Sequence, residues 1–247
     1  MIDLTRITPD ALETRPYRWA FIENLFSPRD GEELAATFPR DGFKTVKGYD
    51  GEKGYEYEAR ALIPMNGTAA SRAEALSPGW RQLAADLLSD AYREAMSRLT
   101  GLNLAELWME VNVFHYGQSA WLGPHVDLEE KLVTHVLYFN DAWDVADGGC
   151  LNILRAGDMK EVEKVIPPLV GNSCVLVRSK NSWHAVSRVR GDSRTSRRSM
   201  TVTFYSPGSV STMWPPGDHT PLHDYRGEPS ALGRLMRRGL RRLRSSV

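Results

Sequence analysis

The spacing of apolar residues predicts two helices in the N-terminal half of the chain. Apolar side chains recur every three or four residues between Ser77-Pro78 and Gly101. Serine followed by proline is typical of a helix start and glycine of a helix end, so we expect one long helix. The apolar face of that helix would comprise Trp80, Leu83, Leu87, Leu88, Ala91, Met96 and Leu99. A shorter helix is predicted over 27–38, with Ser27 as its cap, Pro28 in its first turn and Asp30 at the capping-box position.

From residue 107 onward the period changes to two, which predicts β-strands. The strand-like runs, rich in Val, Thr, Tyr and Phe, span 107–117, 131–140, 149–157, 164–179 and 197–206. Consecutive strands without intervening helices favour an antiparallel sheet that is supported by helices and closes into a barrel or jelly roll. The predicted fold class is therefore mainly β with supporting α-helices.

The chain shows no internal repeat and no low-complexity linker, so we expect one domain over residues 1–247. Its predicted parts are a helical N-terminal support over about 1–106, a jelly-roll core over about 107–206 and a C-terminal extension over 207–247.

Composition narrows the classes of partner and the compartment. The formal net charge is zero, which argues against a dedicated nucleic-acid-binding protein, because neutralising phosphates supplies most of the affinity of such proteins. Cys150 and Cys174 form neither a CxxC motif nor a zinc spacing, so we expect no disulfide framework. The N-terminus has no apolar signal segment and no apolar stretch is long enough to cross a bilayer. A cytoplasmic location is the expectation.

Two histidines and an aspartate form a candidate metal site. His125 and Asp127 stand two residues apart at the end of a strand-like run, where alternate side chains point to the same side. His184 follows the apolar run 173–177 and offers a third ligand. Two histidines and one carboxylate that leave coordination positions open are typical of non-haem iron(II) oxygenases. A zinc site with these ligands, or a purely structural His184, remains open, although the zinc motif HExxH is absent.

Five elements in this order resemble the iron(II)- and 2-oxoglutarate-dependent oxygenases of the prolyl-4-hydroxylase-like group. They are His125-Val126-Asp127, Tyr138, Gly148-Gly149, His184 and Arg197-Arg198-Ser199. The resemblance covers roughly residues 107–206, and more weakly the N-terminal segment 21–39. It implies a double-stranded β-helix (jelly-roll) core and an enzyme that uses Fe(II), with 2-oxoglutarate and O2 as cosubstrates.

The resemblance also assigns roles to individual residues. His125, Asp127 and His184 would bind the iron and form the catalytic centre. The far carboxylate of 2-oxoglutarate would bind an arginine, whose guanidinium suits a bidentate contact. By alternation we place Arg197 there rather than Arg198, because Arg197 shares a face with Ser199, Thr201 and Thr203. Ser199 and Tyr138 would add hydroxyl groups to the same carboxylate.

Four further residues would line the cosubstrate pocket. Leu151 and Val186 would supply apolar surface. Asn112 and Phe114 occupy a strand on which the family carries a tyrosine two residues after an asparagine, so Phe114 replaces the tyrosine. We expect Asn112 to compensate for the lost hydroxyl.

The implied reaction is the oxidation, by hydroxylation foremost, of an unactivated C–H bond in a small metabolite or natural-product intermediate, with release of succinate and CO2. Because Asp127 is intact, halogenation is not expected. Hydroxylation of a protein or peptide residue such as proline is the main alternative, and a non-catalytic cupin-like metal-binding module is another. A nucleic-acid demethylase is disfavoured, because Thr203 stands where that group carries a second arginine.

Substrate contacts are expected from segments outside the core strands. The segment 43–70, rich in Tyr, Gly and charge, predicts a mobile flap in which Tyr57 and Arg60 grip a polar substrate. Trp121 in the lead-in 115–124, the segment 206–225, and Phe114, Thr201 and Thr203 on the core strands would contribute as well.

The segment 231–247 places leucines at helical spacing among many arginines. Two interpretations stay open for it. One is a helix that docks on the domain, and the other is an electropositive handle for a carrier protein or an anionic membrane surface.

Overall fold

The computed structural model describes residues 1–49 and 54–214. The basic helix predicted at 231–247 lies outside these residues, as does most of the segment 206–225.

The described residues form helices and strands with the following bounds. The α-helices are α1 (Pro28–Ala36), α2 (Pro78–Leu88) and α3 (Asp90–Thr100), and the short 3-10 turns are η1 (Leu4–Arg6), η2 (Pro9–Ala11), η3 (Ala73–Ala75) and η4 (Val145–Asp147). The first strands are β1 (Leu12–Glu13), β2 (Trp19–Ile22), β3 (Lys44–Tyr49), β4 (Gly54–Ile63), β5 (Trp108–Tyr116) and β6 (Trp121–His125). The later strands are β7 (Lys131–Tyr138), β8 (Leu151–Leu154), β9 (Val162–Ile166), β10 (Ser173–Val177), β11 (His184–Val186) and β12 (Arg197–Tyr205).

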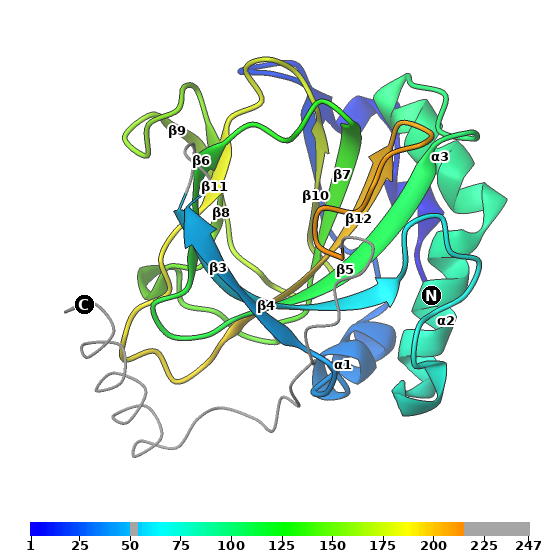
Figure 1. Ribbon diagram of the computed structural model, residues 1–247, viewed down its shortest axis with the longest axis horizontal. Coiled ribbons are helices and arrows are strands. Elements are labelled where there is room, and N and C mark those ends of the chain that lie inside the picture. Colours follow the sequence, from blue (N-terminus) through cyan, green and yellow to red (C-terminus); the bar gives the residue numbers. More distant parts are fainter. Residues whose placement is uncertain (50–53, 215–247) are drawn as a thin grey trace.

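The strands pair in the order β1-β2-β10-β7-β12-β5-β4-β6-β11-β8-β9, and β3 pairs with β4. The sheet curls on itself, so that β6, β8 and β11 face β5, β7 and β12, while the helices lie outside the larger layer (Figure 1). Consecutive core strands in opposite layers and a curled antiparallel sheet define a jelly-roll core. The predicted fold class is confirmed.

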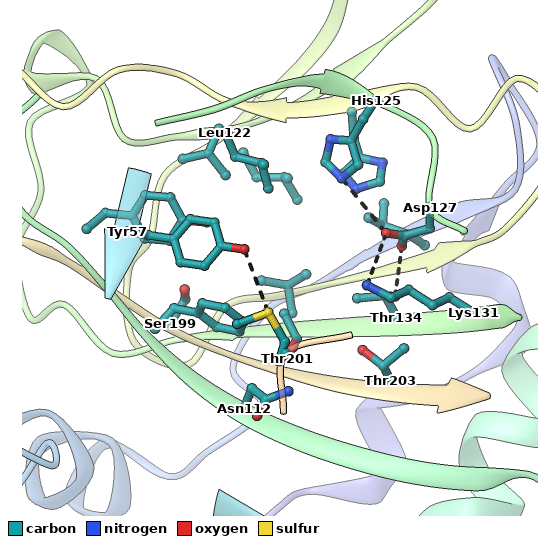
Figure 2. A pocket seen from close by; sticks show the side chains of 18 of the residues that line it. Tyr57, Asn112, Leu122, His125, Asp127, Lys131, Thr134, Ser199, Thr201 and Thr203 are labelled. Atoms are coloured by element: carbon teal, nitrogen blue, oxygen red, sulfur yellow. Dashed lines mark hydrogen bonds and ion pairs between the residues drawn. The ribbon is translucent and has the colours of Figure 1, made fainter. Parts of the chain in front are cut away.

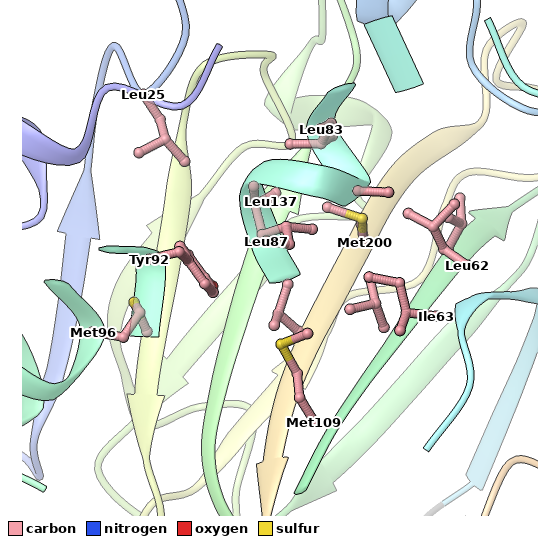
Figure 3. Packing of buried hydrophobic residues seen from close by; sticks show 14 of the residues in the cluster. Leu25, Leu62, Ile63, Leu83, Leu87, Tyr92, Met96, Met109, Leu137 and Met200 are labelled. Carbon is pink, nitrogen blue, oxygen red and sulfur yellow. The ribbon is translucent and has the colours of Figure 1, made fainter. Parts of the chain in front are cut away.

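Strict alternation along the central strands gives the sheet one apolar face and one functional face. On β12, Met200, Val202 and Phe204 belong to the core under the helices, whereas Arg197 and Ser199 face the barrel interior. β5 and β7 follow the same rule, which matches a side-chain period of two. Figure 3 shows part of the core between sheet and helices, where Leu83, Leu87 and Tyr92 pack near Leu137, Met200 and other buried side chains.

The predicted long helix over 77–101 is wrong, because the chain forms two helices that meet at Ser89. The backbone of Ser89 is extended (φ −72°, ψ 148°), and its hydroxyl accepts a hydrogen bond from the Tyr92 amide. A serine side chain that caps a new helix offers the backbone an alternative to continuing the old one. The break changes which residues face the core: Tyr92 is fully buried, whereas Ala91 is exposed.

The predicted flap over 43–70 is wrong as well, since most of this segment is the β-hairpin of β3 and β4. β4 pairs with β5 along one part and with β6 along another, so it joins the two layers of the barrel. The N-terminal part of the chain is therefore not only helical. Glycine and charge in the segment suggested a loop, but β4 alternates between the pocket side, where Tyr57 lies, and the helix side, where Arg60 is buried.

Candidate metal and cosubstrate site

Pairing of β6 with β11 brings the two predicted metal-binding histidines together. His184 lies opposite His125 in the register, and their ring centroids are 4.2 Å apart. Nδ1 of His125 donates to the Gly123 carbonyl and Nδ1 of His184 to the Ser182 carbonyl, both at 3.0 Å. Since a carbonyl oxygen only accepts, both imidazoles carry their proton on Nδ1 and present Nε2 as the ligand atom. Such outer hydrogen bonds fix the orientation of metal-binding histidines.

Asp127 completes the group two residues after β6. Its Oδ1 lies 3.8 Å from Nε2 of His125, and its Oδ2 accepts a hydrogen bond from Thr134 Oγ1 at 3.0 Å. The three candidate ligand atoms of His125, Asp127 and His184 all lie within 4.8 Å of one another. Figure 2 shows His125 and Asp127 converging at one end of the pocket. Two imidazole nitrogens and one carboxylate oxygen form a donor set that fits Fe(II) with open positions.

Arg197 and Arg198 lie on opposite faces of β12. Arg197 is only 2% exposed, donates to Ser199 Oγ, and has its guanidinium 4.7 Å from the ring centroid of Tyr116 and 5.5 Å from that of Tyr138. Arg198 faces the helices, over the ring of Phe38. Of these two arginines, Arg197 is therefore the one whose side chain lies inside the barrel.

At this site two buried polar atoms lack hydrogen-bond partners within the described residues. They are the hydroxyl of Tyr138 and Nε of Arg197 itself. Burial raises the pKa of Tyr138 well above its usual value, so the hydroxyl keeps its proton and can donate. A buried unsatisfied donor costs about 1–3 kcal/mol, which a bound ligand with oxygen acceptors would recover. The carboxylate of 2-oxoglutarate is such a ligand, and these atoms fit it.

Tyr116 is a pocket residue that the sequence did not single out. It lies opposite Arg197 in the register of β5 and β12, and burial raises the pKa of its phenol to about 12. Asn112, expected to compensate for the phenylalanine at 114, is engaged elsewhere: its Nδ2 donates to Glu110 at 3.0 Å and its Oδ1 accepts from Trp214 at 2.7 Å. Tyr116 therefore supplies a phenol near Arg197 in addition to that of Tyr138. Tyr116 stands two residues after Phe114, so the alternation of side chains along the strand places both on the same face and could have predicted it.

Most of the remaining predicted residues line this one pocket. They are Tyr57, Asn112, Phe114, Leu151, Val186, Thr201 and Thr203, together with Ser199. Residues that were not predicted line it too, namely Leu122, Lys131, Thr134, Val136, Leu176, Tyr205 and Met213. The hydroxyl of Tyr57 points into the pocket toward the sulfur of Met213, which lies 3.8 Å away (Figure 2). The described start of the 206–225 segment thus reaches the pocket.

Arg60 and Trp121 lie away from the pocket, contrary to expectation. Tyr57 and Arg60 are three residues apart on β4, and an odd separation places side chains on opposite faces of a strand. Arg60 is consequently buried on the helix side of the sheet, 3.4 Å from Asp41. Trp121 stacks against the guanidinium of Arg188, 3.7 Å from its ring centroid, while its neighbour Leu122 lines the pocket.

The two-glycine turn before β8 requires both of its glycines. Gly148 and Gly149 have φ of +71° and +68°, a region that disfavours residues with a Cβ. A Cβ on Gly148 would also overlap the Arg188 carbonyl. The turn leads directly into β8, whose first residue is the pocket residue Leu151.

The comparisons with known proteins agree with this geometry. Residues 111–205 match the family model of the 2OG-Fe(II) oxygenase superfamily. Among solved structures, a prolyl-4-hydroxylase from Pseudomonas putida superposes with a TM-score of 0.55 at 21% identity, covering 76% of this chain and 92% of its own. A prolyl 4-hydroxylase from Phytophthora capsici reaches a TM-score of 0.56 at 16% identity, covering 83% of this chain and 64% of its own. An oxidoreductase of the 2OG-Fe(II) oxygenase family from Burkholderia pseudomallei reaches 0.53 at 15% identity, covering 76% and 84%.

No curated protein sequence matches the chain. The likeness to the solved structures shows the shared jelly-roll fold, and the family model adds the enzyme class. Residues 111–205 are similar to the 2OG-Fe(II) oxygenase superfamily, and this match together with the candidate metal site indicates a 2-oxoglutarate-dependent iron dioxygenase that uses Fe(II), 2-oxoglutarate and O2.

Proposed function

We propose that His125, Asp127 and His184 hold the Fe(II) ion and that Arg197 holds the far carboxylate of 2-oxoglutarate. The convergence of the three candidate ligand atoms within 4.8 Å carries the first assignment. The buried guanidinium and the Tyr138 hydroxyl, which has no hydrogen-bond partner within 1–49 and 54–214, support the second. Ser199 and Tyr116 complete the polar end of this site, and Leu151 and Val186 exclude water from it.

The protein positions the metal and the cosubstrate, supplies a positive charge and excludes water from the site. When bound, iron and 2-oxoglutarate supply the oxidising chemistry, in which O2 and 2-oxoglutarate are converted to succinate and CO2 as the substrate is oxidised. Arg197 orients the cosubstrate through a charge-assisted contact, which is strong inside a buried site. Thr134 holds the carboxylate of Asp127 in place through its hydrogen bond.

For the substrate we propose a small metabolite or natural-product intermediate, free or bound to a carrier protein, that is hydroxylated at an unactivated C–H bond. The observation that supports this proposal is the contact between two residues that line the pocket, Met213 and Tyr57, with the Met213 sulfur 3.8 Å from the Tyr57 hydroxyl. An extended peptide that binds between these two side chains would have to break this contact. A cytoplasmic setting and a role in natural-product synthesis belong to the same proposal. None of the described helices is long and apolar enough to span a bilayer.

Hydroxylation of a prolyl or other peptide residue is the second candidate. It is favoured by the similarity of the fold to that of the Pseudomonas putida prolyl-4-hydroxylase. The experiment that separates the two candidates measures Fe(II)-dependent succinate formation over a panel of small metabolites and a panel of proline-containing peptides. We expect a small metabolite to raise the rate above that without added compound. Stimulation by peptides alone would contradict the small-molecule proposal and support the alternative.

We expect Tyr138→Phe to raise the KM for 2-oxoglutarate about 10-fold or more, because a hydrogen bond to a charged group contributes about 1.5–3 kcal/mol. The melting temperature of the ligand-free variant should stay equal or rise, since the hydroxyl has no partner among the described residues. Tyr92→Phe is the matched control: its hydroxyl bonds to His135 Nδ1 at 2.9 Å, outside the pocket. That change should lower stability and leave the KM for 2-oxoglutarate as it was. Equal KM values in both variants would argue against a Tyr138 contact.

A further inference from the structure

Glu110 is a fully buried carboxylate in the wall of the barrel. It lies on β5 opposite Thr203 of β12, and Thr203 in turn lies opposite Thr134 of β7, the residue that holds Asp127. Two strand spacings of about 4.8 Å therefore separate Glu110 from the strand that supports the metal ligand. Three of its neighbours, Asn112, Thr203 and Tyr205, line the pocket.

The carboxylate of Glu110 is satisfied on one side only. Its Oε2 accepts from Asn112 Nδ2 at 3.0 Å and from the Tyr205 hydroxyl at 3.2 Å. Its Oε1 is buried and has no hydrogen-bond partner among the described residues. A buried carboxylate oxygen without a partner is costly, and Glu110 lies directly beside residues that line the pocket, so this oxygen points to a ligand.

No basic side chain of the described residues forms an ion pair with Glu110. The pocket contains two basic residues, Lys131 and Arg197. Lys131 is directed toward the metal site, with its Nζ 4.0 Å from Asp127 Oδ1. Arg197 lies opposite Tyr116, six residues further along β5, which is a distance of about 20 Å along a strand. Arg197 thus lies at the opposite end of the strand from Glu110, whereas Lys131 lies at the same end as Glu110 but is paired with Asp127.

We propose that Glu110 recognises a primary ammonium group of the substrate through Oε1, so that the enzyme oxidises an amine-bearing small molecule. This inference rests on the proposed function. An ammonium supplies both the missing proton donor and the missing positive charge, whereas a hydroxyl would supply only the donor. A guanidinium binds carboxylates best through two oxygens, and Oε2 is already occupied by two donors. A single free oxygen suits the compact, point-like charge of an ammonium.

The segment that ends the described chain contacts the neighbours of Glu110. Trp214 donates to the Oδ1 of Asn112, whose Nδ2 donates to Glu110, and Met213 of the same segment lines the pocket. The amine end of the substrate would therefore lie toward Trp214, and the carbon that is oxidised toward His125 and Asp127.

The test compares amines with their N-acetyl derivatives in the wild-type holoenzyme. Succinate formation is measured with Fe(II), 2-oxoglutarate and matched pairs, such as free amino acids, linear diamines and each N-acetylated counterpart. For stimulating pairs we expect kcat/KM to fall about 10- to 100-fold on acetylation, as expected for the loss of a hydrogen bond to a charged group. In Glu110→Gln the amine should lose most of that advantage. Glu106→Gln, which removes an exposed acid four residues earlier, is the matched control and should keep the wild-type preference.

Several outcomes would overturn the ammonium site. Stimulation by neutral or N-acetylated compounds but by no amine contradicts it, as does an unchanged preference in Glu110→Gln. The comparison within wild type needs no variant, so a wild-type enzyme that shows no preference for the amine overturns the site even if Glu110→Gln does not fold. A melting temperature of ligand-free Glu110→Gln at or above that of wild type supports a ligand-binding role, and a clear fall supports a structural one. Wild-type protein that binds neither Mn(II) nor 2-oxoglutarate would instead overturn the proposed function on which the inference rests.

Discussion

Asp127→Ala and His184→Ala are each expected to abolish 2-oxoglutarate-dependent turnover and to weaken Fe(II) binding by at least about 100-fold. Outer-shell partners of metal ligands already change affinity by about 10- to 100-fold, and a ligand itself should matter at least as much. Binding is measured directly by titrating the metal-free protein with Fe(II) under anaerobic conditions, so the result does not depend on turnover. Both variants should fold, because the side chains of Asp127 and His184 line the pocket and are not part of the apolar core under the helices.

Glu129→Ala is the control for the aspartate, since it removes an acid two residues away whose side chain is 84% exposed. It should retain the iron affinity of the wild type. Wild-type turnover and iron affinity in His184→Ala would show that the assignment of the metal ligands is wrong.

Period-two alternation predicted much of this site because it is a local property of the chain. It separated Arg197 from Arg198 and placed Ser199, Thr201 and Thr203 on the same face as Arg197, which is where the structure has them. The same rule separates Tyr57 from Arg60 in the segment 54–63, because they are three residues apart on one strand. The composition of that segment outweighed its pattern, and the hairpin was missed.

The register between strands that are distant in the sequence could not be predicted from the sequence. That His184 lies opposite His125, and Tyr116 opposite Arg197, depends on how distant strands pair. The role of Glu110 could not be predicted for the same reason. An acidic residue on a strand is usually exposed to solvent, and only the structure shows that Glu110 is buried and which residues surround it. The break at Ser89 was hidden for another reason. The apolar spacing continues across it closely enough to suggest one helix, and only the capping hydrogen bond to Tyr92 reveals two.

Arg197→Met is expected to raise the KM for 2-oxoglutarate at least about 30-fold. Removing one partner of a buried, hydrogen-bonded charge pair costs about 2–5 kcal/mol, and every 1.4 kcal/mol is a factor of ten. The bound carboxylate would then face the rings of Tyr116 and Tyr138 without a counter-ion. The affinity is measured as the concentration of 2-oxoglutarate that gives half-maximal succinate formation, and independently by calorimetric titration with Mn(II) in place of iron.

Arg198→Met is the matched variant, because it removes the same group from the next residue of the same strand. Arg198 donates to the Ala35 carbonyl at 3.5 Å and lies over Phe38, so it ties the end of α1 to the sheet. Its loss should lower the melting temperature and change the KM for 2-oxoglutarate less than about 3-fold, since surface and partly exposed contacts contribute little to a distant site. Equal effects of the two substitutions on the KM would mean that the cosubstrate carboxylate does not bind on the inner face of β12. The anchor would then have to be sought among the other polar residues that line the pocket, of which Lys131 is the remaining cation.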